Sequence, residues 1–382
     1  MASFMSDLAA HLLECSAHYH DRSLEPLYPY ASSADVTEER GRSALKRWVL
    51  KAAARAGFHR QAAATAARQA SALRRISRVE EGLEATYGLL ADEHSRRTLV
   101  EVMAYRILGP SKVRMACNDG AFRSHLLRAS TLAVREGTVA IDLLDGKLDL
   151  FDLAPLGFPI QADLHRLNVT ATFQLEQYRY SRGGRTIEAG PGDVVIDGGG
   201  CWGDTALYFA HRVGAQGRVV SFEFSPDNLP ILRANLAKNA ALGGRVHVVE
   251  RALWDRSDER LDFAPHGPAT TLRAPSVSAD SPNATTLTLT IDDLVEREPL
   301  PRVDFIKMDI EGAETSALRG AERTLKTFAP KLAVTLYHSL DDFVEVPRYL
   351  HSLNLGYQFF IDHFSIKQEE TVLFAEVAPG TP

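Results

Sequence analysis

The sequence has few cysteines, no long apolar run and no large excess of charge of one sign. Its 382 residues include only three cysteines, Cys15, Cys117 and Cys201, which are too few and too scattered for a disulfide framework or a CxxC metal site. It contains no run of 18 uncharged apolar residues, so we expect no membrane-spanning segment. The net charge of −6 does not favour a nucleic-acid partner.

The remaining composition is that of a globular protein. Hydrophobic residues make up 45% and charged residues 24% of the chain, which excludes disordered and collagen-like classes. The N-terminus lacks a basic segment and carries Asp7 and Glu14 where a secretory signal would be apolar. We therefore expect a cytoplasmic protein, and the length favours two or three domains at about 150 residues each.

Residues 1–131 are predicted to form a helical N-terminal region. Apolar residues recur every three or four positions over residues 79–109, which indicates two helices, the second beginning near Asp92 or Ser95. Upstream, residues 40–79 hold eleven Lys or Arg and no acid. Their spacing is typical of the solvated face of a helix, and a polyanion or acidic-substrate contact is the other interpretation.

Residues 132–190 are predicted to form a small β-containing connector. The runs 138–144, 170–176 and 177–181 favour strands because they alternate or are rich in β-branched and aromatic residues. The Gly-Gly pair at 183–184 indicates a turn.

Residues 191–382 alternate apolar runs of strand length with helical segments, the pattern of a doubly wound α/β domain. Strands that are apolar on both faces are typical of a parallel sheet covered by helices. Two further strand-like runs near residues 356–377 predict a C-terminal hairpin, so a mixed sheet is expected. Residues 263–283 contain four prolines and no strand pattern, which suggests a long loop able to act as a lid.

A glycine-rich segment carries the strongest chemical signal. An apolar strand runs into Asp197, then Gly198, Gly199, Gly200, Cys201, Trp202 and Gly203, before a predicted helix. Glycines let the backbone turn sharply and approach a ligand closely, and the helix N-terminus presents free N–H groups. This combination predicts a nucleotide-type ligand.

Two classes of ligand fit this segment. Gly198, Gly200 and Gly203 match the dinucleotide fingerprint G-x-G-x-x-G, with Glu223 twenty residues further on. Asp197, however, would repel the pyrophosphate of NAD and favour the positively charged methionine end of S-adenosylmethionine. Glu223 suits either ligand, because both offer ribose hydroxyls. Asp197 therefore favours S-adenosylmethionine.

The chain resembles the FkbM-type methyltransferases. The resemblance rests on KMDIEGAE (307–314), VIDGGGCWGDTAL (195–207), FEFSPDNLPILRANL (222–236) and TLTIDDL (288–294), and it extends over about residues 174–376. It implies a Rossmann-like, mixed-sheet α/β fold of the class I methyltransferase type. Family members often carry Ala-Asn where this chain has Gly200 and Cys201.

The resemblance also implies how S-adenosylmethionine is bound. Asp197, Gly199 and Gly203 would line its methionine portion, and Glu223 would take the ribose hydroxyls. The adenine would lie along two residues, and three more would sit close by at the start of the helix: Ala252 and Leu253, then Trp202, Asp204 and Thr205.

Candidate catalytic residues follow the predicted strands, because open α/β sheets bind ligands at the carboxyl ends of their strands. Asp309 is expected at the junction of cofactor and acceptor, with His338 or His363 as general base. Glu311 is a further candidate, and helix capping is its other role. Lys307, in an apolar strand, is expected to pair with an acid. Mixed carboxylate and imidazole donors are not diagnostic of one metal, so we assign none.

The expected reaction is O-methylation of a hydroxyl on a sugar, glycan or polyketide-like natural product. N-methylation of a peptide amide or amine is the close alternative. An NAD(P)-dependent oxidoreductase that uses the Gly198–Gly203 loop, and a non-catalytic partner module that docks through residues 40–78, are alternatives of other classes. The expected partner is a small-molecule or glycan acceptor, and the oligomeric state, a homo-oligomer included, is left open.

Overall fold

The protein is built around one seven-stranded mixed sheet. The computed structural model describes residues 3–16, 65–142, 144, 146–264, 270–273 and 284–378. From edge to edge the strands are β15 (Tyr357–His363), β16 (Thr371–Val377), β14 (Lys331–Thr335), β13 (Phe305–Met308), β6 (Val194–Gly198), β7 (Arg218–Phe222) and β8 (Val246–Val249). Strands β14, β13, β6, β7 and β8 are parallel, whereas β16 is antiparallel to both β14 and β15. The predicted mixed sheet and C-terminal hairpin are confirmed.

Both faces of the sheet are buried, as the apolar runs predict. Val195 and Phe305 belong to one hydrophobic cluster, while their neighbours Ile196 and Ile306 belong to another. Successive side chains of a strand point to opposite faces, so each cluster covers one face. The helices that follow the strands are α7 (Asp204–Arg212), α8 (Leu229–Lys238), α9 (Ala240–Gly243), α10 (Ile291–Arg297), α11 (Glu314–Arg319), α12 (Glu322–Phe328) and α13 (Asp342–Ser352).

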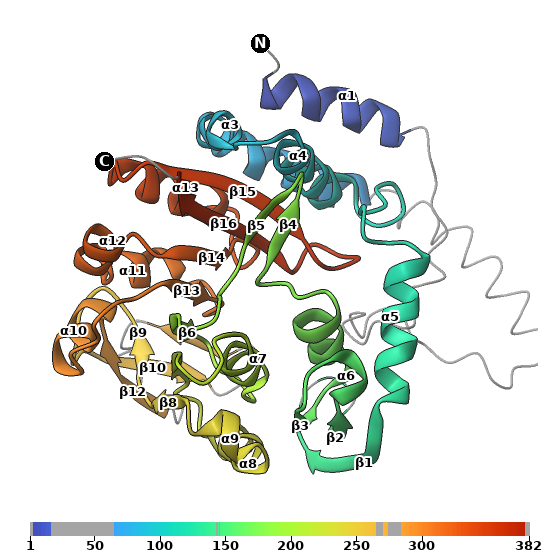
Figure 1. The fold of residues 1–382 in the computed structure, drawn as a ribbon. Helices are drawn as coiled ribbons and strands as arrows, with labels where there is room; N and C mark the ends of the chain where they lie inside the picture. The colour runs from blue at the N-terminus through green and yellow to red at the C-terminus, as the bar shows by residue number, and fades with distance from the viewer. Residues whose placement is uncertain are drawn as a thin grey trace, which may run out of the picture.

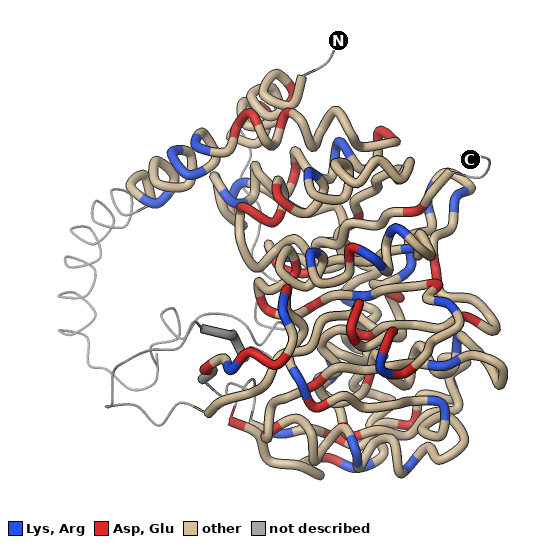
Figure 2. Tube along the Cα trace, turned by 90° about the vertical axis from the view of Figure 1, so that its left-hand side faces the viewer, with Lys and Arg blue, Asp and Glu red and all other residues tan. Residues whose placement is uncertain are grey.

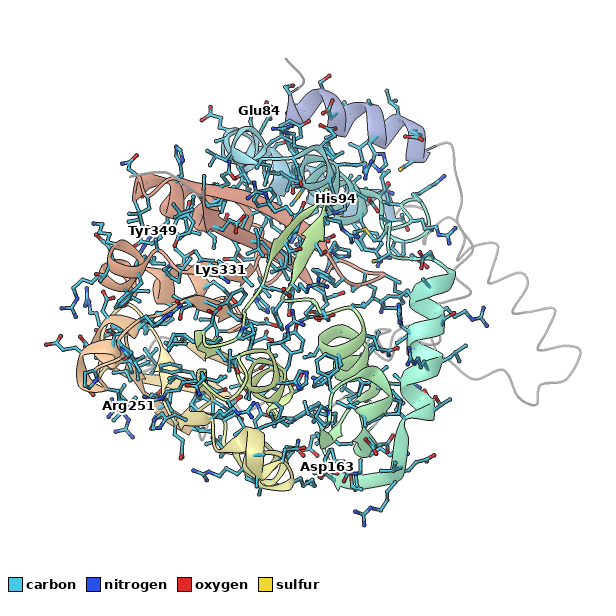
Figure 3. The ribbon with its side chains drawn as sticks, in the orientation of Figure 1. Glu84, His94, Asp163, Arg251, Lys331 and Tyr349 are labelled. Atoms are coloured by element: carbon cyan, nitrogen blue, oxygen red, sulfur yellow. The ribbon has the colours of Figure 1, made fainter. Side chains whose placement is uncertain are left out.

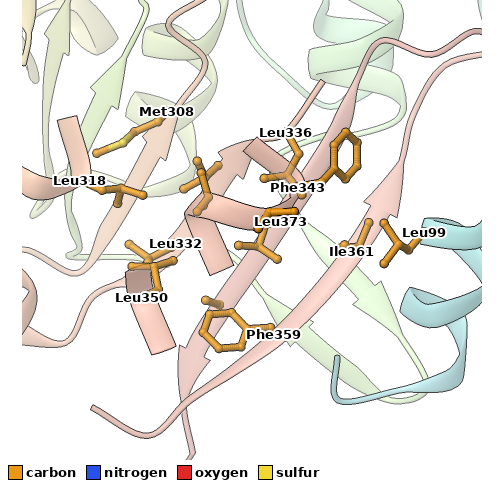
Figure 4. Packing of buried hydrophobic residues seen from close by; sticks show 14 of the residues in the cluster. Leu99, Met308, Leu318, Leu332, Leu336, Phe343, Leu350, Phe359, Ile361 and Leu373 are labelled. Carbon is orange, nitrogen blue, oxygen red and sulfur yellow. The ribbon is translucent and has the colours of Figure 1, made fainter. Parts of the chain in front are cut away.

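The N-terminal helices pack beside the C-terminal hairpin. They are α1 (Phe4–Ser16), α3 (Glu80–Leu89), α4 (Glu93–Leu108) and α5 (Gly120–Thr131). Figure 1 shows α4 next to β15, with α1 packed on the far side of α4, and Leu99 of α4 packs near Ile361 of that strand (Figure 4). The prediction of two helices within 79–109 is confirmed, because Asp92 caps α4 by accepting a hydrogen bond from Ser95 N. Thus α4 shares its core with the sheet.

The basic segment is described only in part. Residues 65–78 are helical, and Arg68, Arg74, Arg75 and Arg78 lie along that helix (Figure 2). The predicted face over residues 40–64 lies outside the described residues. Among the described residues, no helix combines the length and apolar character needed to cross a bilayer.

In the connector the prediction is correct in part: residues 177–179, for example, form a turn and only the end of the run 177–181 is a strand. Strands β1 (Ala133–Ala140), β2 (Lys147–Asp152) and β3 (Gln161–Leu164) form a three-stranded sheet, with the one-turn helix η2 (Ala154–Leu156) between β2 and β3, and β4 (Tyr180–Arg182) and β5 (Arg185–Ile187) form a hairpin around the predicted Gly-Gly turn. The run 170–176 is not a strand.

Residues 166–174 instead form the helical turns α6 (Arg166–Asn168) and η3 (Val169–Gln174). Helical spacing brings Asn168 and Thr172 to one side, where both donate hydrogen bonds to Asp204 at 3.2 and 2.8 Å. These tertiary contacts outweigh the weak β preference of the β-branched residues.

A second small sheet follows β8. It pairs β9 (Ala252–Leu253), β12 (Ala284–Leu289), β10 (Arg260–Ala264) and β11 (Thr271–Arg273). The expectation that 263–283 contains no strand is wrong at β11, which pairs antiparallel with β10. The rest of that predicted lid, residues 265–269 and 274–283, lies outside the described residues.

Candidate active site

A cavity follows the carboxyl edge of the parallel strands. It encloses about 1270 Å³ of space, a figure that includes its opening to solvent. The lining on the β6–β8 half includes Gly199, Cys201, Phe222, Glu223, Phe224, Arg251 and Leu253. The lining on the β13–β16 half includes Lys307, Asp309, Ile310, Glu311, Tyr337, Phe364 and Glu370. Residues of the N-terminal region and connector complete the lining: Phe122, Leu167, Asn168, Thr170, Ala171, Thr172, Gln177 and Tyr178.

The glycine segment lies between these halves. Gly199 has φ +85°, and a Cβ there would lie 2.0 Å from the backbone oxygen of Asp309. A Cβ at Gly200 would lie 2.3 Å from Ser221 Oγ, and both Gly199 N and Gly200 N donate to Phe222 O. The glycines are therefore required for the loop to pack between β7 and the end of β13. Their backbone forms the floor of the cavity at Gly199.

Asp197 lies beneath this floor rather than in the lining. Its side chain is fully buried, it accepts hydrogen bonds from Thr205 Oγ1 and Ser221 Oγ, and it pairs with Lys307 Nζ at 3.2 Å. Lys307 also donates to Gly198 O at 2.9 Å and Gly199 O at 2.7 Å. The expected pairing of Lys307 with an acid is confirmed. Lys307 thus neutralises the charge of Asp197, and the glycine floor separates Asp197 from the cavity. The sequence argument that Asp197 repels a diphosphate directly therefore does not apply in the structure.

Glu223 does reach the cavity. Its Oε1 accepts hydrogen bonds from the backbone N–H groups of Phe224 and Ser225, both at 2.7 Å, and its Oε2 accepts from Asn228 Nδ2. Burial raises the pKa of Glu223 to about 6, although these donors act to lower it. The backbone N–H of Cys201 also acts on this carboxylate, so a hydroxyl group bound there would share its oxygens with four protein donors.

The other predicted cofactor residues divide into two groups. Asp204, Thr205 and Leu253 line the cavity, although burial raises the pKa of Asp204, whose carboxylate is held by Asn168 and Thr172. The remainder lie in the packing behind the described lining: Gly198, Gly200, Trp202, Gly203 and Ala252. Trp202 is 1% exposed within the hydrophobic cluster on the connector side.

Asp309 is the most heavily bonded carboxylate on the β13–β16 half of the described lining. Its Oδ2 accepts from Tyr178 OH at 2.8 Å, and its Oδ1 accepts from Tyr337 OH at 3.0 Å. Burial acts to raise the pKa of Asp309, but His338, Lys307 and the two tyrosines outweigh it, and the net pKa is lowered. Asp309 is therefore an anion at neutral pH, with both tyrosine hydroxyls directed at it.

His338 is surrounded by carboxylates. Its Nδ1 lies 3.0 Å from Glu314 Oε1, and its Nε2 lies 3.4 Å from Asp309 Oδ1 and 3.6 Å from Glu311 Oε1. Burial acts to lower the pKa of His338, but Glu311 and Glu314 raise it well above its ordinary value. The imidazole is consequently a cation at neutral pH, which is unsuited to accepting a proton.

His363 is outside the described lining. Its Nδ1 lies 2.8 Å from Thr371 Oγ1, and burial lowers its pKa to about 4. A base must lie within hydrogen-bond reach of the proton that it takes, directly or through one water. The structure thus brings Asp309, Glu311 and His338 together at the cavity but leaves His363 in the packing of the hairpin.

Three of these groups have donor types suited to a divalent metal. One ligand atom each of Asp309, Glu314 and His338 lies within 4.8 Å of the others. Glu314 Oε1, however, is already occupied by Ile310 N, Thr335 Oγ1 and His338 Nδ1. The cluster is held together by its own hydrogen bonds, and we assign no metal.

Three lining residues near Asp309 were not expected from the sequence. Tyr337 directly precedes His338 at the end of β14, so the strand-end rule contained a signal for it. Glu370 immediately precedes β16, which is antiparallel and so begins at the edge where β14 ends. Tyr178 lies 131 residues from its partner Asp309, and no local pattern marks it.

Comparison with known proteins agrees with this geometry. The family model described as the methyltransferase FkbM domain matches residues 187–359. Residues 187–359 belong to this methyltransferase family. The FkbM domain therefore includes the glycine loop, Glu223, Asp309 and His338, whereas Glu370 and the N-terminal helices lie outside the matched range.

The chain is also similar to solved structures of methyltransferases, and one of these has a TM-score above 0.5. The chain is similar to the crystal structure of methyltransferase FkbM from Methylobacillus flagellatus KT, with 19% identity and a TM-score of 0.51 over 79% of this chain and 60% of that one. The precorrin-6y C5,15-methyltransferase from Geobacter metallireducens GS-15 matches at 17% identity and a TM-score of 0.34, covering 55% and 87% of the two chains. The Bacillus cereus O-methyltransferase in complex with SAH matches at 16% identity and 0.32, covering 68% and 91%. No curated protein matches the chain.

The FkbM domain thus has the class I methyltransferase fold, as the sequence predicted. The chain spans 60% of the length of the FkbM methyltransferase from Methylobacillus flagellatus.

Proposed function

We propose that the protein transfers a methyl group from S-adenosylmethionine to a hydroxyl of a sugar, glycan or polyketide-like acceptor. The observation that carries the proposal is the continuous cavity that joins the glycine floor and Glu223 to Asp309 within an FkbM methyltransferase domain. The N-terminal region and connector also reach this cavity, through Phe122 and Leu167. This supports residues 1–131 and 132–190 as acceptor-binding regions beside a cytoplasmic methyltransferase domain at 191–382.

The β6–β8 half fits the cofactor. Glu223 presents a cavity-lining carboxylate to ribose hydroxyls, and Phe224 and Leu253 offer apolar surface to the adenine. Gly199 supplies a floor without side chain for the methionine portion. When bound, S-adenosylmethionine supplies a methyl group on a positively charged sulfur.

The β13–β16 half would position the acceptor. Asp309, ionised and bonded to two tyrosine hydroxyls, is placed to orient both the charged end of the cofactor and the acceptor group. His338 holds Asp309 and Glu311 in place as a cation. Holding two reactants in line is a large part of catalysis of a displacement reaction.

N-methylation of an amine or peptide amide is the second candidate. The β13–β16 half presents Asp309, Glu311 and Glu370, while Lys307 is already neutralised by Asp197. A lining rich in carboxylates favours a protonated amine over a neutral hydroxyl.

Calorimetric titration tests the cofactor. We expect S-adenosylmethionine to bind and NAD to give no heat, and binding of NAD alone would establish the oxidoreductase alternative. With methyl-labelled S-adenosylmethionine, a screen of hydroxyl and amine acceptors then separates O- from N-methylation. Label found only on nitrogen would overturn the hydroxyl assignment.

A further inference from the structure

Glu370 stands at the end of the cavity farthest along the sheet from Glu223. It lies in the link of the C-terminal hairpin, where its backbone oxygen accepts a hydrogen bond from Phe364 N at 3.0 Å. Because β16 runs antiparallel to β14, Glu370 is brought to the carboxyl edge beside Tyr337. Across that edge the order is Glu223, the glycine floor, Asp309, Tyr337 and Glu370.

The carboxyl of Glu370 differs from those of Asp309 and Glu314 in having no hydrogen-bond donor within the part of the chain that the structure describes. Asp309 accepts from two tyrosines, and Glu314 accepts from a backbone N–H, a threonine and a histidine. No described residue donates to the half-buried Glu370 carboxyl, although it lines the cavity. A group in this state has its acceptor positions available to whatever enters the cavity.

The other candidates for a proton acceptor are engaged. His338 is a cation among three carboxylates, and His363 lies outside the described lining. Glu311 faces the cavity but lies 3.6 Å from His338 Nε2 as its counter-ion. Among the described lining residues on the β13–β16 half, Glu370 is left as the carboxyl with neither a hydrogen-bond donor nor a counter-ion.

We propose that Glu370 is the catalytic residue that takes the proton of the acceptor, an inference that rests on the proposed methyl transfer. The acceptor O–H or N–H bond breaks with its proton moving to the Glu370 carboxylate. The acceptor atom forms a bond to the methyl carbon, and the carbon–sulfur bond breaks with its electron pair remaining on sulfur. The thioether S-adenosylhomocysteine and the methylated acceptor are the products.

The protonation of Glu370 offers a test that needs no acceptor. Burial, followed by the charges of Asp309 and Glu369, raises the pKa of Glu370 to about 8, so the free enzyme holds a proton there at pH 7. The titratable groups that face Glu370 are Asp309, Glu311, His338, Tyr178, Tyr337 and Glu369. A sulfonium held near Asp309, whose charge acts on Glu370, would favour the charged form of Glu370 and displace that proton, whereas the neutral thioether would not.

The experiment is calorimetric titration at pH 7.5 in buffers of different ionisation enthalpy, which counts the protons released on binding. We expect S-adenosylmethionine to release more protons than S-adenosylhomocysteine, by a difference that approaches about one proton. In Glu370→Gln this difference should vanish. The affinity for S-adenosylmethionine should also rise from pH 6 to pH 8 in the wild type and stay flat in Glu370→Gln.

Two matched variants make the result specific. Glu369→Gln changes the neighbouring carboxyl, which is not in the described lining; because its charge helps to raise the pKa of Glu370, this variant should reduce the proton difference without abolishing it. Glu311→Gln changes the other cavity glutamate, whose charge contributes less to that pKa, and should leave most of the difference in place. If the difference survives in Glu370→Gln, or disappears only in Glu311→Gln, the assignment of Glu370 is overturned. Absence of any S-adenosylmethionine binding would instead refute the proposed function itself.

Discussion

The two halves of the carboxyl edge are built differently. On the β6–β8 half, Glu223 is held by Phe224 N, Ser225 N and Asn228, all within five residues of it. On the β13–β16 half, Asp309 is held by Tyr178 and Tyr337, 131 and 28 residues away. The first half is a local motif, whereas the second is assembled by the fold. We expect the first to respond to changes of backbone shape and the second to changes of charge.

The largest effect is expected from Gly199→Ala, which changes the loop that lies between the two halves. The new Cβ would overlap the backbone oxygen of Asp309, 2.0 Å away, at a φ of +85° that disfavours alanine. Loop strain alone costs ~1–3 kcal/mol, and displacing Asp309 adds to it. We expect a fall of more than ~3 kcal/mol in the free energy of unfolding and loss of cofactor binding, measured by urea denaturation and calorimetry.

Gly88→Ala is the matched control for that variant. Gly88 is an exposed position of α3, and a Cβ added there would have nothing within 4 Å, so alanine should stabilise the protein by ~0.5–1 kcal/mol. Unchanged cofactor affinity in Gly199→Ala would contradict the role of Gly199 as the cavity floor.

The next effect is expected from Lys307→Met, which leaves the buried carboxylate of Asp197 without its cation. Breaking a buried ion pair by removing one partner costs ~3–5 kcal/mol. The double variant Lys307→Met with Asp197→Asn removes both charges and should lose less than Lys307→Met alone. Lys331→Met, at a partly exposed lysine of β14 labelled in Figure 3, should lose less than ~1 kcal/mol. Strictly additive losses in the double variant would show that the pair is not coupled.

The same contrast explains what the sequence could predict. The strands, the mixed sheet, the glycine loop and Glu223 follow from patterns within about thirty residues, and the structure has the strands and loop as expected. The strand expected over 170–176 is wrong because distant Asp204 selects helical spacing for Asn168 and Thr172. Tyr178 and Glu370 were missed for the same reason, since only the fold brings them to Asp309.

A third prediction separates binding from turnover. Asp309→Ala and His338→Ala should keep the fold but lower kcat at least about 10²-fold, because the acceptor would no longer be aligned. Glu223→Ala should mainly raise KM for S-adenosylmethionine, since a hydrogen bond to a charged group is worth ~1.5–3 kcal/mol. Labelled-methyl transfer to the acceptor found by screening measures both constants. A kcat equal to that of the wild type in both Asp309→Ala and His338→Ala would show that Asp309 and His338 take no part in catalysis.

The smallest effect concerns the pH dependence of stability. The raised pKa values of Glu223, about 6, and Glu370, about 8, mean that the folded state holds protons that the unfolded chain has lost. The free energy of unfolding must then fall as pH rises. For both groups the fall begins near pH 4.5, the pKa of the unfolded chain; it ends near pH 6 for Glu223 and near pH 8 for Glu370. At pH 8, Glu370→Gln should therefore have a free energy of unfolding ~1–3 kcal/mol above that of the wild type, measured by urea denaturation. This gain should become smaller toward pH 5. A gain that is already complete at pH 6 would contradict a Glu370 pKa raised to about 8.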